Sequence, residues 1–481
     1  MGHLMSVFDK LARLTKRRVQ MLATASVMAV AMAPVQAETL ADAMVAAYSH
    51  SGLLDQNRAL LRAADEDVAS TVAGLRPIVN WTADVTRSFS NSRSSATGAG
   101  TISSGDTDAN VGLAAQLLLF DGGRTRLEIE AAKETVLATR QTLLSIEQQV
   151  LLRAVQAYMN LQRNYELVRL RQNNLRLIDE ELRAARERFD VGEVTRTDVA
   201  QAEARRSASE SALAAARGDL AQAIEEYAAS TGHRPKRLTS AGPLPKISRS
   251  VESAKSVALR HHPDMIKTQH DIAAAELLVQ AAEAATRPTV TLNGSLGVND
   301  EFNSSSYSHA GSVGVQLSGP IYQGGRLSSQ VRRAVAQRDA QRGLQHVIRH
   351  SVQANVGNAY AILRAAQSQV ESGQSQIRAA RVAFRGVQEE AKLGSRTTLD
   401  VLNAEQELLN AQSTLISAQS DVYIAAYAVL ASMGQLTARD LNLAVQIYDP
   451  AAYYNLAKDA PTNRSKQGKQ LDRVLQKLGK Q

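Results

Sequence analysis

Two short motifs and one histidine pair have residue types and spacings that could do chemistry. Gly122-Gly123-Arg124 and Gly324-Gly325-Arg326 each stand between a strand-like and a helix-like segment, as phosphate-binding loops do. Both lack the glycine spacing and the Lys-Ser/Thr pair of such loops, so both are more simply turns from a strand into a helix. His346 and His350 lie one helical turn apart, but no carboxylate or third histidine accompanies them as metal ligands.

The remaining sequence has no arrangement that indicates catalysis. We find no Ser/His/Asp set and no paired carboxylates of the kind that acid–base chemistry requires. The chain contains no cysteine, which excludes disulfides, thiolate metal sites and cysteine nucleophiles. We therefore predict a protein without enzymatic activity, cofactor or metal site.

The net charge of +8 is concentrated at the two ends of the 481-residue chain. Residues 1–37 carry five Lys and Arg against one Asp, and residues 458–481 carry seven against two. The long segment between them is close to neutral, so we predict no nucleic-acid partner. A mean hydropathy of -0.22 is too polar for a bundle of membrane-spanning helices.

Residues 1–37 are typical of an export signal. A basic stretch from Lys10 to Arg18 precedes an apolar run from Met21 to Met32, and Val35-Gln36-Ala37 resembles a signal-peptidase site. We predict cleavage after Ala37 and export of the mature chain. An uncleaved anchor helix is the alternative, which the shortness of the apolar run disfavours.

The mature chain is a tandem duplication. Leu119–Arg124 matches Ile321–Arg326 at an offset of 202 residues, whereas Arg76-Pro77 matches Arg287-Pro288 at an offset of 211. The nine extra residues of the first half fall in the Ser/Gly-rich stretch Ser90 to Asp106, which we predict to be a longer loop.

The duplication suggests four segments along the chain. Residues 1–37 are the signal peptide, residues 38–245 the first repeat, residues 246–455 the second repeat, and residues 456–481 a basic flexible tail. Each repeat is predicted to contain a helix, two strands, a very long helix, a tight turn and a second long helix. The fold class is therefore mixed α and β, mainly α.

The predicted strands alternate apolar and polar residues over about ten positions, the length of a tilted transmembrane strand. Trp81, Phe120 and Tyr322 are the aromatic residues that we expect at the membrane interface. Two water-soluble hairpins packed on helices would give the same alternation. The signal peptide and the helices favour the membrane interpretation.

The predicted long helices have heptad-like spacing that suits close packing, as in Val401, Ala404, Leu408 and Ala411. This spacing is interrupted around Gly192 and Gly394, which we interpret as the tips of two antiparallel helical hairpins. Four strands cannot close a barrel, and an open sheet edge is not tolerated in lipid. The barrel must then be shared among chains, with the hairpins projecting to one side as a conduit.

These segments resemble the TolC family of outer-membrane channel proteins. The resemblance rests on the duplicated unit and on Arg188–Gly192 followed by Thr197-Asp198-Val199, which recur as Gly394 to Ala404 in the second half. It implies a homotrimer with a transmembrane β-barrel in the outer-membrane lipid, four strands from each chain, continued by a periplasmic α-helical barrel. It further implies the exit duct of a tripartite efflux pump or type I secretion system, docked to a periplasmic adaptor and an inner-membrane ABC or proton-driven pump.

The resemblance also implies roles for particular residues at the hairpin tips. Thr197, Asp198 and Arg396 match a polar network that closes the periplasmic mouth, and Asp400 matches an acidic ring inside it. Asn403 stands where some members have a second Asp. The residues that match the adaptor-docking tips are Val191, Gly192, Glu193, Val194, Leu393, Gly394 and Ser395.

Some of these positions depart from the family or allow a simpler role. Ala391 stands where the best-known members have a gate Tyr, and Glu390 stands where the first half has Arg188. Asp198 and Asp400 could be ordinary carboxylates at helix N-termini, and Arg396 could be a solvated surface charge. The alternative to an exit duct is a soluble periplasmic coiled-coil scaffold or adaptor. Such an adaptor normally has one hairpin and a lipoyl-like domain, whereas this chain has two hairpins.

Overall fold

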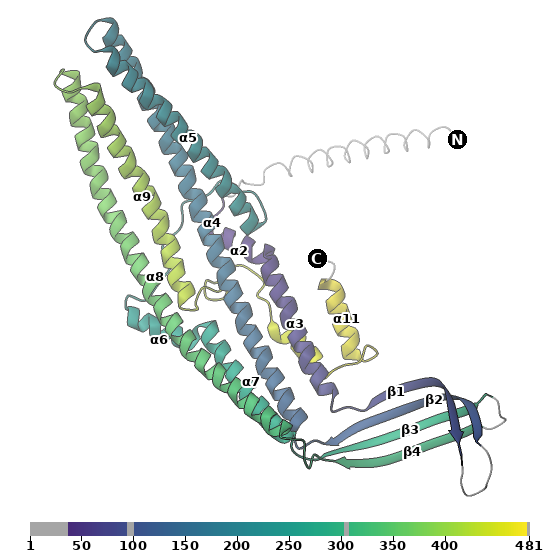
Figure 1. Ribbon diagram of the computed structural model, residues 1–481. Coiled ribbons are helices and arrows are strands. Elements are labelled where there is room, and N and C mark those ends of the chain that lie inside the picture. The colour runs from purple at the N-terminus through teal and green to yellow at the C-terminus, as the bar shows by residue number, and fades with distance from the viewer. Residues whose placement is uncertain (1–36, 94–100, 303–306, 479–481) are drawn as a thin grey trace, which may run out of the picture.

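The computed structural model describes residues 37–93, 101–302 and 307–478 of the chain. It shows two very long helical hairpins that extend from a body of shorter helices, with one four-stranded sheet at the opposite end (Figure 1). The prediction of a mainly helical protein with four strands is confirmed. The predicted signal peptide lies outside the described residues, apart from Ala37.

The same order of elements occurs twice. The first half contains α2 (Leu40–His50), α3 (Gly52–Ala73), β1 (Ile78–Ser92), β2 (Ile102–Phe120), α4 (Arg124–Asp190) and α5 (Arg196–Thr231). The second half contains α6 (Val251–His261), α7 (Pro263–Ala284), β3 (Thr289–Glu301), β4 (Tyr307–Ser318), α8 (Arg326–Lys392) and α9 (Thr398–Ser432). The longest helices, α4 and α8, have 67 residues each.

The sheet is antiparallel throughout, in the order β1-β2-β3-β4. Its pairing repeats at the two offsets seen in the sequence. Ile78 lies opposite Gln116, and adding 211 to the first number and 202 to the second gives Thr289 opposite Ser318, which is the observed register. The duplication is therefore present in the hydrogen-bond pattern as well as in the residues.

The strands are longer than predicted, with 15 residues in β1 and 19 in β2. The expectation of a loop from Ser90 to Asp106 is wrong at both ends of that stretch, because Ser90 pairs with Ser104 and Ser92 with Ile102. The ladder continues because backbone groups pair whatever the side chains are, and polar serines are tolerated on a strand whose side chains face water.

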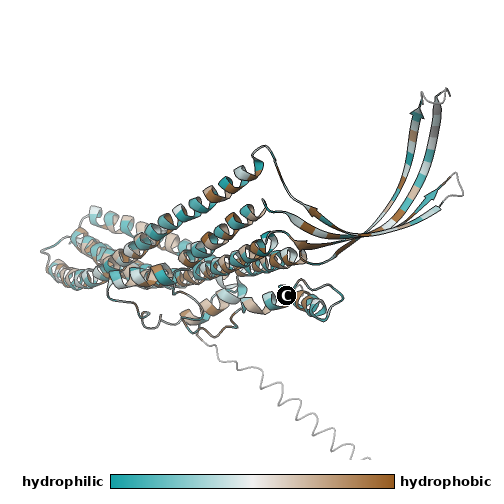
Figure 2. Cartoon of the chain, turned by 90° about the horizontal axis from the view of Figure 1, so that it is seen from below, coloured by the Kyte–Doolittle hydropathy of each residue, from teal (hydrophilic) through white to brown (hydrophobic). Residues whose placement is uncertain are grey.

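Hydropathy alternates along the strands (Figure 2). The registers place the apolar residues of paired strands opposite one another, so one face of the sheet is mainly apolar. Trp81 pairs with Leu113 on this face and is 74% exposed. The register shifts between Leu118 and Phe120, so that Phe120 lies opposite Val290. This bulge returns Phe120 to the apolar face, since directly opposed residues point to the same side. Tyr322, beyond the end of β4, is 87% exposed.

The packed core lies in the helical body, between the hairpins and the sheet. One cluster joins α2, α3, α4 and the end of α5 around Tyr158 and Tyr227, and a second joins α6, α8 and α9 around Val356 and Val429. Helix α7 packs against both α4 and α8 and thereby links the two halves. Among the described helices, α9 is long and apolar enough to cross a membrane, but its buried residues pack in these clusters as in a core helix.

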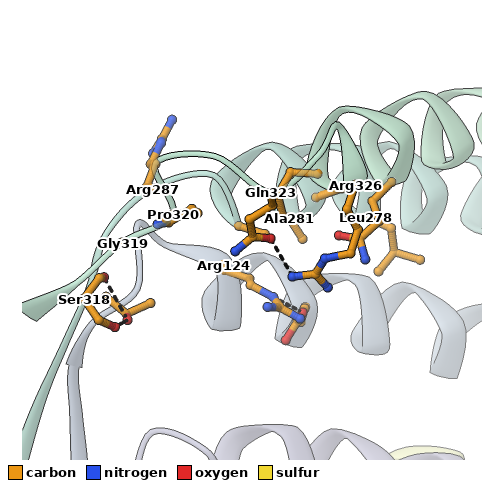
Figure 3. Close-up of a pocket in the computed structure, with 15 residues that line it drawn as sticks. Arg124, Leu278, Ala281, Arg287, Ser318, Gly319, Pro320, Gln323 and Arg326 are labelled. Atoms are coloured by element: carbon orange, nitrogen blue, oxygen red, sulfur yellow. Dashed lines mark hydrogen bonds and ion pairs between the residues drawn. The ribbon is translucent and has the colours of Figure 1, made fainter.

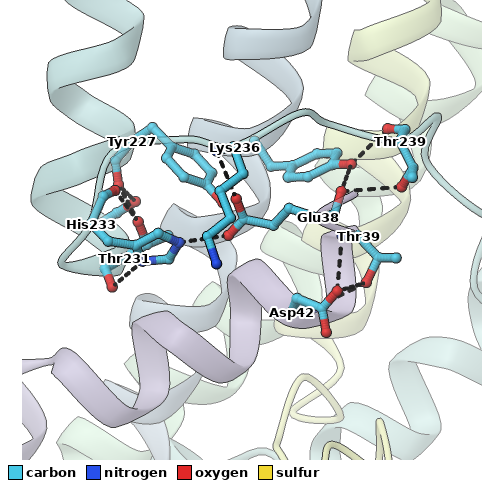
Figure 4. Close-up of polar contacts among 10 residues, drawn as sticks. Glu38, Thr39, Asp42, Tyr227, Thr231, His233, Lys236 and Thr239 are labelled. Atoms are coloured by element: carbon cyan, nitrogen blue, oxygen red, sulfur yellow. Dashed lines mark hydrogen bonds and ion pairs between the residues drawn. The ribbon is translucent and has the colours of Figure 1, made fainter. Parts of the chain in front are cut away.

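The predicted start of the mature chain is anchored in this body (Figure 4). Glu38 is 6% exposed; its carboxylate lies 2.8 Å from His233 Nε2 and accepts a hydrogen bond from the Lys236 amide. Its backbone carbonyl accepts hydrogen bonds from the Tyr158 hydroxyl and from Thr239. The residue that follows the predicted cleavage site is thus a structural part of the fold.

The C-terminal segment differs from the flexible tail expected from its composition. It forms α10 (Pro450–Ala457) and α11 (Lys466–Leu478), in which Leu471 is buried against Tyr453 and Ala457. Arg76 donates hydrogen bonds to the carbonyls of Asp459 and Ala460, which ties the turn between the two helices to the end of α3. A few apolar residues at helical spacing are enough to dock a basic segment.

Candidate entrance at the hairpin tips

Both hairpin tips use the same backbone turn. At the first tip, the Gly192 and Glu193 amides donate to the carbonyls of Phe189 and Arg188, at 3.0 and 2.9 Å. This pattern is a Schellman motif, which requires a residue with positive φ, and Gly192 has φ +81°. A side chain would meet nothing at this position, so the backbone conformation alone calls for glycine.

The second tip repeats this geometry with Gly394 at φ +78°. The Gly394 and Ser395 amides donate to the carbonyls of Ala391 and Glu390, at 3.1 and 3.0 Å. Apolar side chains point outward at both ends, since Val191 is 71% and Leu393 85% exposed. Each tip thus exposes one aliphatic side chain on a turn of the same shape.

The predicted gate carboxylates cap the two helices that leave the tips. Asp198 accepts hydrogen bonds from the Thr195 amide and hydroxyl at 2.9 and 2.7 Å, and Asp400 accepts the same pair from Thr397 at 3.0 and 2.9 Å. Each threonine hydroxyl accepts from the aspartate amide in return, which completes a capping box. In a single chain, these carboxylates therefore have the helix-terminal role that the sequence left open.

The charge of Asp400 is maintained by its surroundings. Hydrogen bonds from the Thr397 amide and hydroxyl lower the pKa of the Asp400 carboxyl, and the nearby Arg396 guanidinium lowers it further. The carboxylate is consequently ionised at neutral pH and available to attract cations.

Arg396 is paired within its own tip. Its Nε donates to Glu390 Oε2 at 2.8 Å, and both side chains are half exposed. Glu390, noted in the sequence as a departure from Arg188 of the first repeat, is therefore the partner of Arg396. Thr197 lies exposed near the start of α5.

The two hairpins are joined near their tips by an apolar contact that the sequence did not reveal. Leu402 of α9 is 1% exposed and packs on a set of residues from α4 and α5: Ile178, Leu182, Ala185, Val199 and Ala202. We call this contact, together with the polar pairs beside it, the inter-hairpin seam. It lies within a few residues of Asp400, so the seam and the predicted gate are neighbours along α9.

The polar pairs of the seam connect α9 to α4 and α5. Asn174 Nδ2 donates to Glu405 Oε1 at 2.8 Å, with both residues buried, and the second oxygen of Glu405 is buried without a partner. Burial raises the pKa of Glu405 to about 7. Asn403, predicted as part of the gate, accepts from Arg205 at 3.1 Å and so belongs to the seam.

Comparison with known proteins finds similarity to outer membrane efflux proteins. A profile of the family described as Outer membrane efflux protein matches residues 44–233 and 255–435. The chain is 38% identical over 424 residues to Outer membrane efflux protein BepC of Brucella suis biovar 1, which covers 88% of this chain and 91% of that protein. It is 26% identical over 435 residues to Outer membrane protein TolC of Escherichia coli K12, which covers 84% of each.

Solved structures agree with the fold. The Campylobacter jejuni CmeC outer membrane channel superposes with a TM-score of 0.73 and covers 89% of this chain and 91% of the channel chain, at 18% identity. At that identity the likeness concerns the arrangement of helices and strands alone.

Proposed function

This chain belongs to the outer membrane efflux protein family and is an exit duct of the outer membrane, and from this premise we propose that it works as a homotrimer docked to a periplasmic adaptor and an inner-membrane pump. The family consists of channel proteins rather than enzymes. In this proposal, residues 38–245 and 246–455 are equivalent wall units, and Asp400, Asp198, Thr197 and Arg396 surround the mouth.

The observation that carries the homotrimer is the set of contacts between the two repeats. Within the chain, β2 pairs with β3, and α4 packs on both α7 and α9. The repeat-equivalent contacts would join β4 to β1, and α8 to α3 and α5. In the described residues, β4 and β1 are the two free edges of the sheet, and α8 does not pack in this way on α3 or α5. A second copy supplies all three contacts at once, and three copies close the ring.

The repeat offsets predict the register between neighbouring chains. Asn110 of β2 lies opposite Asn299 of β3. Their equivalents, at offsets of 202 and 211, are Ser312 of β4 and Ser88 of β1, so we expect Ser312 to face Ser88 of the neighbour. Because the chain has no cysteine, a Ser88→Cys, Ser312→Cys variant should form disulfides only between subunits.

Non-reducing gel electrophoresis of that variant after oxidation in membranes should give bands of one, two and three chains, with none larger. The matched control is Ser88→Cys with Ser308→Cys, which places the second thiol four residues away, about 13 Å along the strand. Equal crosslinking of both variants would contradict the register, and a ladder that continues beyond three chains would contradict the trimer.

The adaptor-docking role is proposed for the exposed tips, Val191 to Val194 and Leu393 to Ser395. It is supported by the identical Schellman turns, which present Val191 and Leu393 in the same way. In the trimer six such tips, alternately from the first and second repeats, surround the mouth. A partner helix that packs between adjacent tips would cover these aliphatic side chains.

The acidic ring is proposed to hold multivalent cations at the mouth. Replacing Asp400 by alanine should weaken block of single-channel current by hexaamminecobalt(III), because three symmetry-related carboxylates are lost. Asp400→Asn, which removes the charge but keeps an oxygen able to cap α9, should weaken block equally. Unchanged block in the asparagine variant would show that the charge of Asp400 does not act on the pore.

A further inference from the structure

A cavity of about 680 Å³ lies where the sheet meets the helical tube (Figure 3). It is bounded by the first turns of α4 and α8, the end of α7, and the adjoining ends of β3 and β4. Its lining contains three arginines, Arg124, Arg287 and Arg326, and one carboxylate, that of Glu128. This excess of positive charge contrasts with the acidic residues at the hairpin tips.

The sheet shows which side of the wall the cavity faces. Thr289 and Ser318 line it, and their side-chain oxygens are 3.1 Å apart across the β3–β4 ladder. Both belong to the polar face, because they alternate with Val290 and Leu317 of the apolar face. In a barrel that spans lipid the apolar face is outside. The cavity therefore opens toward the interior of the duct.

The three arginines differ in how their charges are used. Arg287 donates to the Gly122 carbonyl at 2.9 Å and holds the turn before α4. Arg124 forms an ion pair with Glu128 at 2.8 Å. Arg326 donates to the side-chain amide oxygen of Gln323 at 2.5 Å. Because this amide is neutral, it does not balance the positive charge of Arg326.

The first repeat shows what the second lacks at the same place. Asp121, the equivalent of Gln323, accepts hydrogen bonds from the Gly123 amide and from the amide and hydroxyl of Thr125, at 3.0, 2.7 and 2.5 Å. These bonds cap α4, and the arginine of the first repeat, Arg124, pairs with the carboxylate of Glu128. In the second repeat, the equivalents of Asp121 and Glu128 are both neutral, Gln323 and Gln330, so no carboxylate of this set stands beside Arg326. An anion from outside the chain would restore the missing charge.

We propose that the Arg326 cavity binds anionic groups, carboxylate or phosphate, of molecules that pass through the duct. The inference rests on the proposed trimeric duct, in which three such cavities form a cationic ring between the helical tube and the barrel. Arg326 contacts the anion directly. The positive charge of Arg124 also attracts the anion, although it is partly balanced by Glu128, and the carboxylate of Glu128 repels the anion. The ring provides an intermediate binding site for acidic transported molecules once they have passed the acidic mouth.

Binding of inorganic pyrophosphate and of citrate to the purified full-length protein, measured by isothermal titration calorimetry, tests the proposal. Arg326→Gln should weaken binding by about tenfold or more, because a charge-assisted hydrogen bond is lost. Glu128→Gln should strengthen it, since the one opposing carboxylate is removed. Arg234→Gln, the same charge change at an 80% exposed side chain outside the cavity, should leave binding unchanged.

Loss of affinity for either anion in Arg326→Gln, with the opposite effect in Glu128→Gln, supports the cavity, and the anion affected tells phosphate from carboxylate recognition. The proposal is overturned if the parent protein binds neither anion, or if Arg326→Gln binds both anions as tightly as the parent. These outcomes are independent of the disulfide ladder, so the trimeric duct can stand when the anion cavity falls.

Discussion

Replacing Leu402 by aspartate should hold the entrance open and raise single-channel conductance several-fold. Leu402 is 1% exposed and is the one α9 side chain in the apolar cluster with Ile178 and Leu182 of α4. Removing a buried leucine costs about 2–5 kcal/mol, and an unpaired carboxylate in its place adds a desolvation cost. Leu402 is the α9 residue at the centre of this apolar cluster, so α9 should separate from α4 near the tip.

Conductance in planar lipid bilayers measures this effect, because the mouth is the narrowest part of the proposed duct. The matched control is Leu399→Asp, the same substitution three residues earlier at a side chain that is 40% exposed. It should leave conductance close to the parent value. Equal conductance of Leu402→Asp and the parent would remove the seam from the closing mechanism.

Replacing Glu405 by glutamine should stabilise the closed seam at neutral pH and remove its pH dependence. Burial raises the pKa of Glu405 from 4.5 to about 7, against the hydrogen bond from Asn174 and the charge of Arg205, while Glu181 adds to the increase. The closed form therefore holds a proton that the open, solvated form releases. Below pH 4.5 both forms are protonated, and Glu405 costs the closed form nothing.

As pH rises from 4.5 to 7 the open form ionises first, so the closed seam loses stability through this window. Above pH 7 the closed seam has lost the full amount, about 3 kcal/mol of stability relative to the open form. Channels of the parent should accordingly open more often as pH rises, and those of Glu405→Gln should not, because glutamine keeps the oxygen that accepts from Asn174.

Open probability measured across this pH range distinguishes the two channels. The control is Glu252→Gln on α6, since the Glu252 side chain is 80% exposed, pairs with Lys255 and lies outside the seam. That variant should keep the pH dependence of the parent. A parent channel whose opening does not change with pH would contradict the role given to Glu405.

The hairpin tips could be predicted from the sequence because their geometry is local. A glycine at C′ and a threonine three residues before an aspartate specify a Schellman turn and a capping box without help from the rest of the fold. The two offsets found in the sequence recur in the strand pairing, although the connection between β1 and β2 is the longer one. The duplication thus allowed most of the order of helices and strands to be predicted.

The seam could not be predicted, because it depends on which helices meet. Glu203 and Glu405 occupy equivalent positions in matching sequences, yet the first is half exposed and the second is 3% exposed. Within one chain, the contact of α9 with α4, more than two hundred residues apart in the sequence, buries Glu405, whereas the proposed α8–α5 contact at Glu203 needs a neighbouring chain. The strand pairing at the two ends of the Ser90–Asp106 stretch and the docked α11 were missed for a related reason. Polar composition predicts loops, but it does not reveal a neighbouring strand or helix that supplies a partner.

The equal length of α4 and α8 limits how this protein can change. Both hairpins start from the same sheet, and in the proposed complex their tips must reach the same level for the adaptor to contact all of them. Deleting two turns from α4 alone would lower every second tip by about 11 Å and leave a crown of uneven height. A shorter or longer tube is therefore accessible only through matched deletions or insertions in both repeats, so that tube length behaves as one shared trait of the two halves.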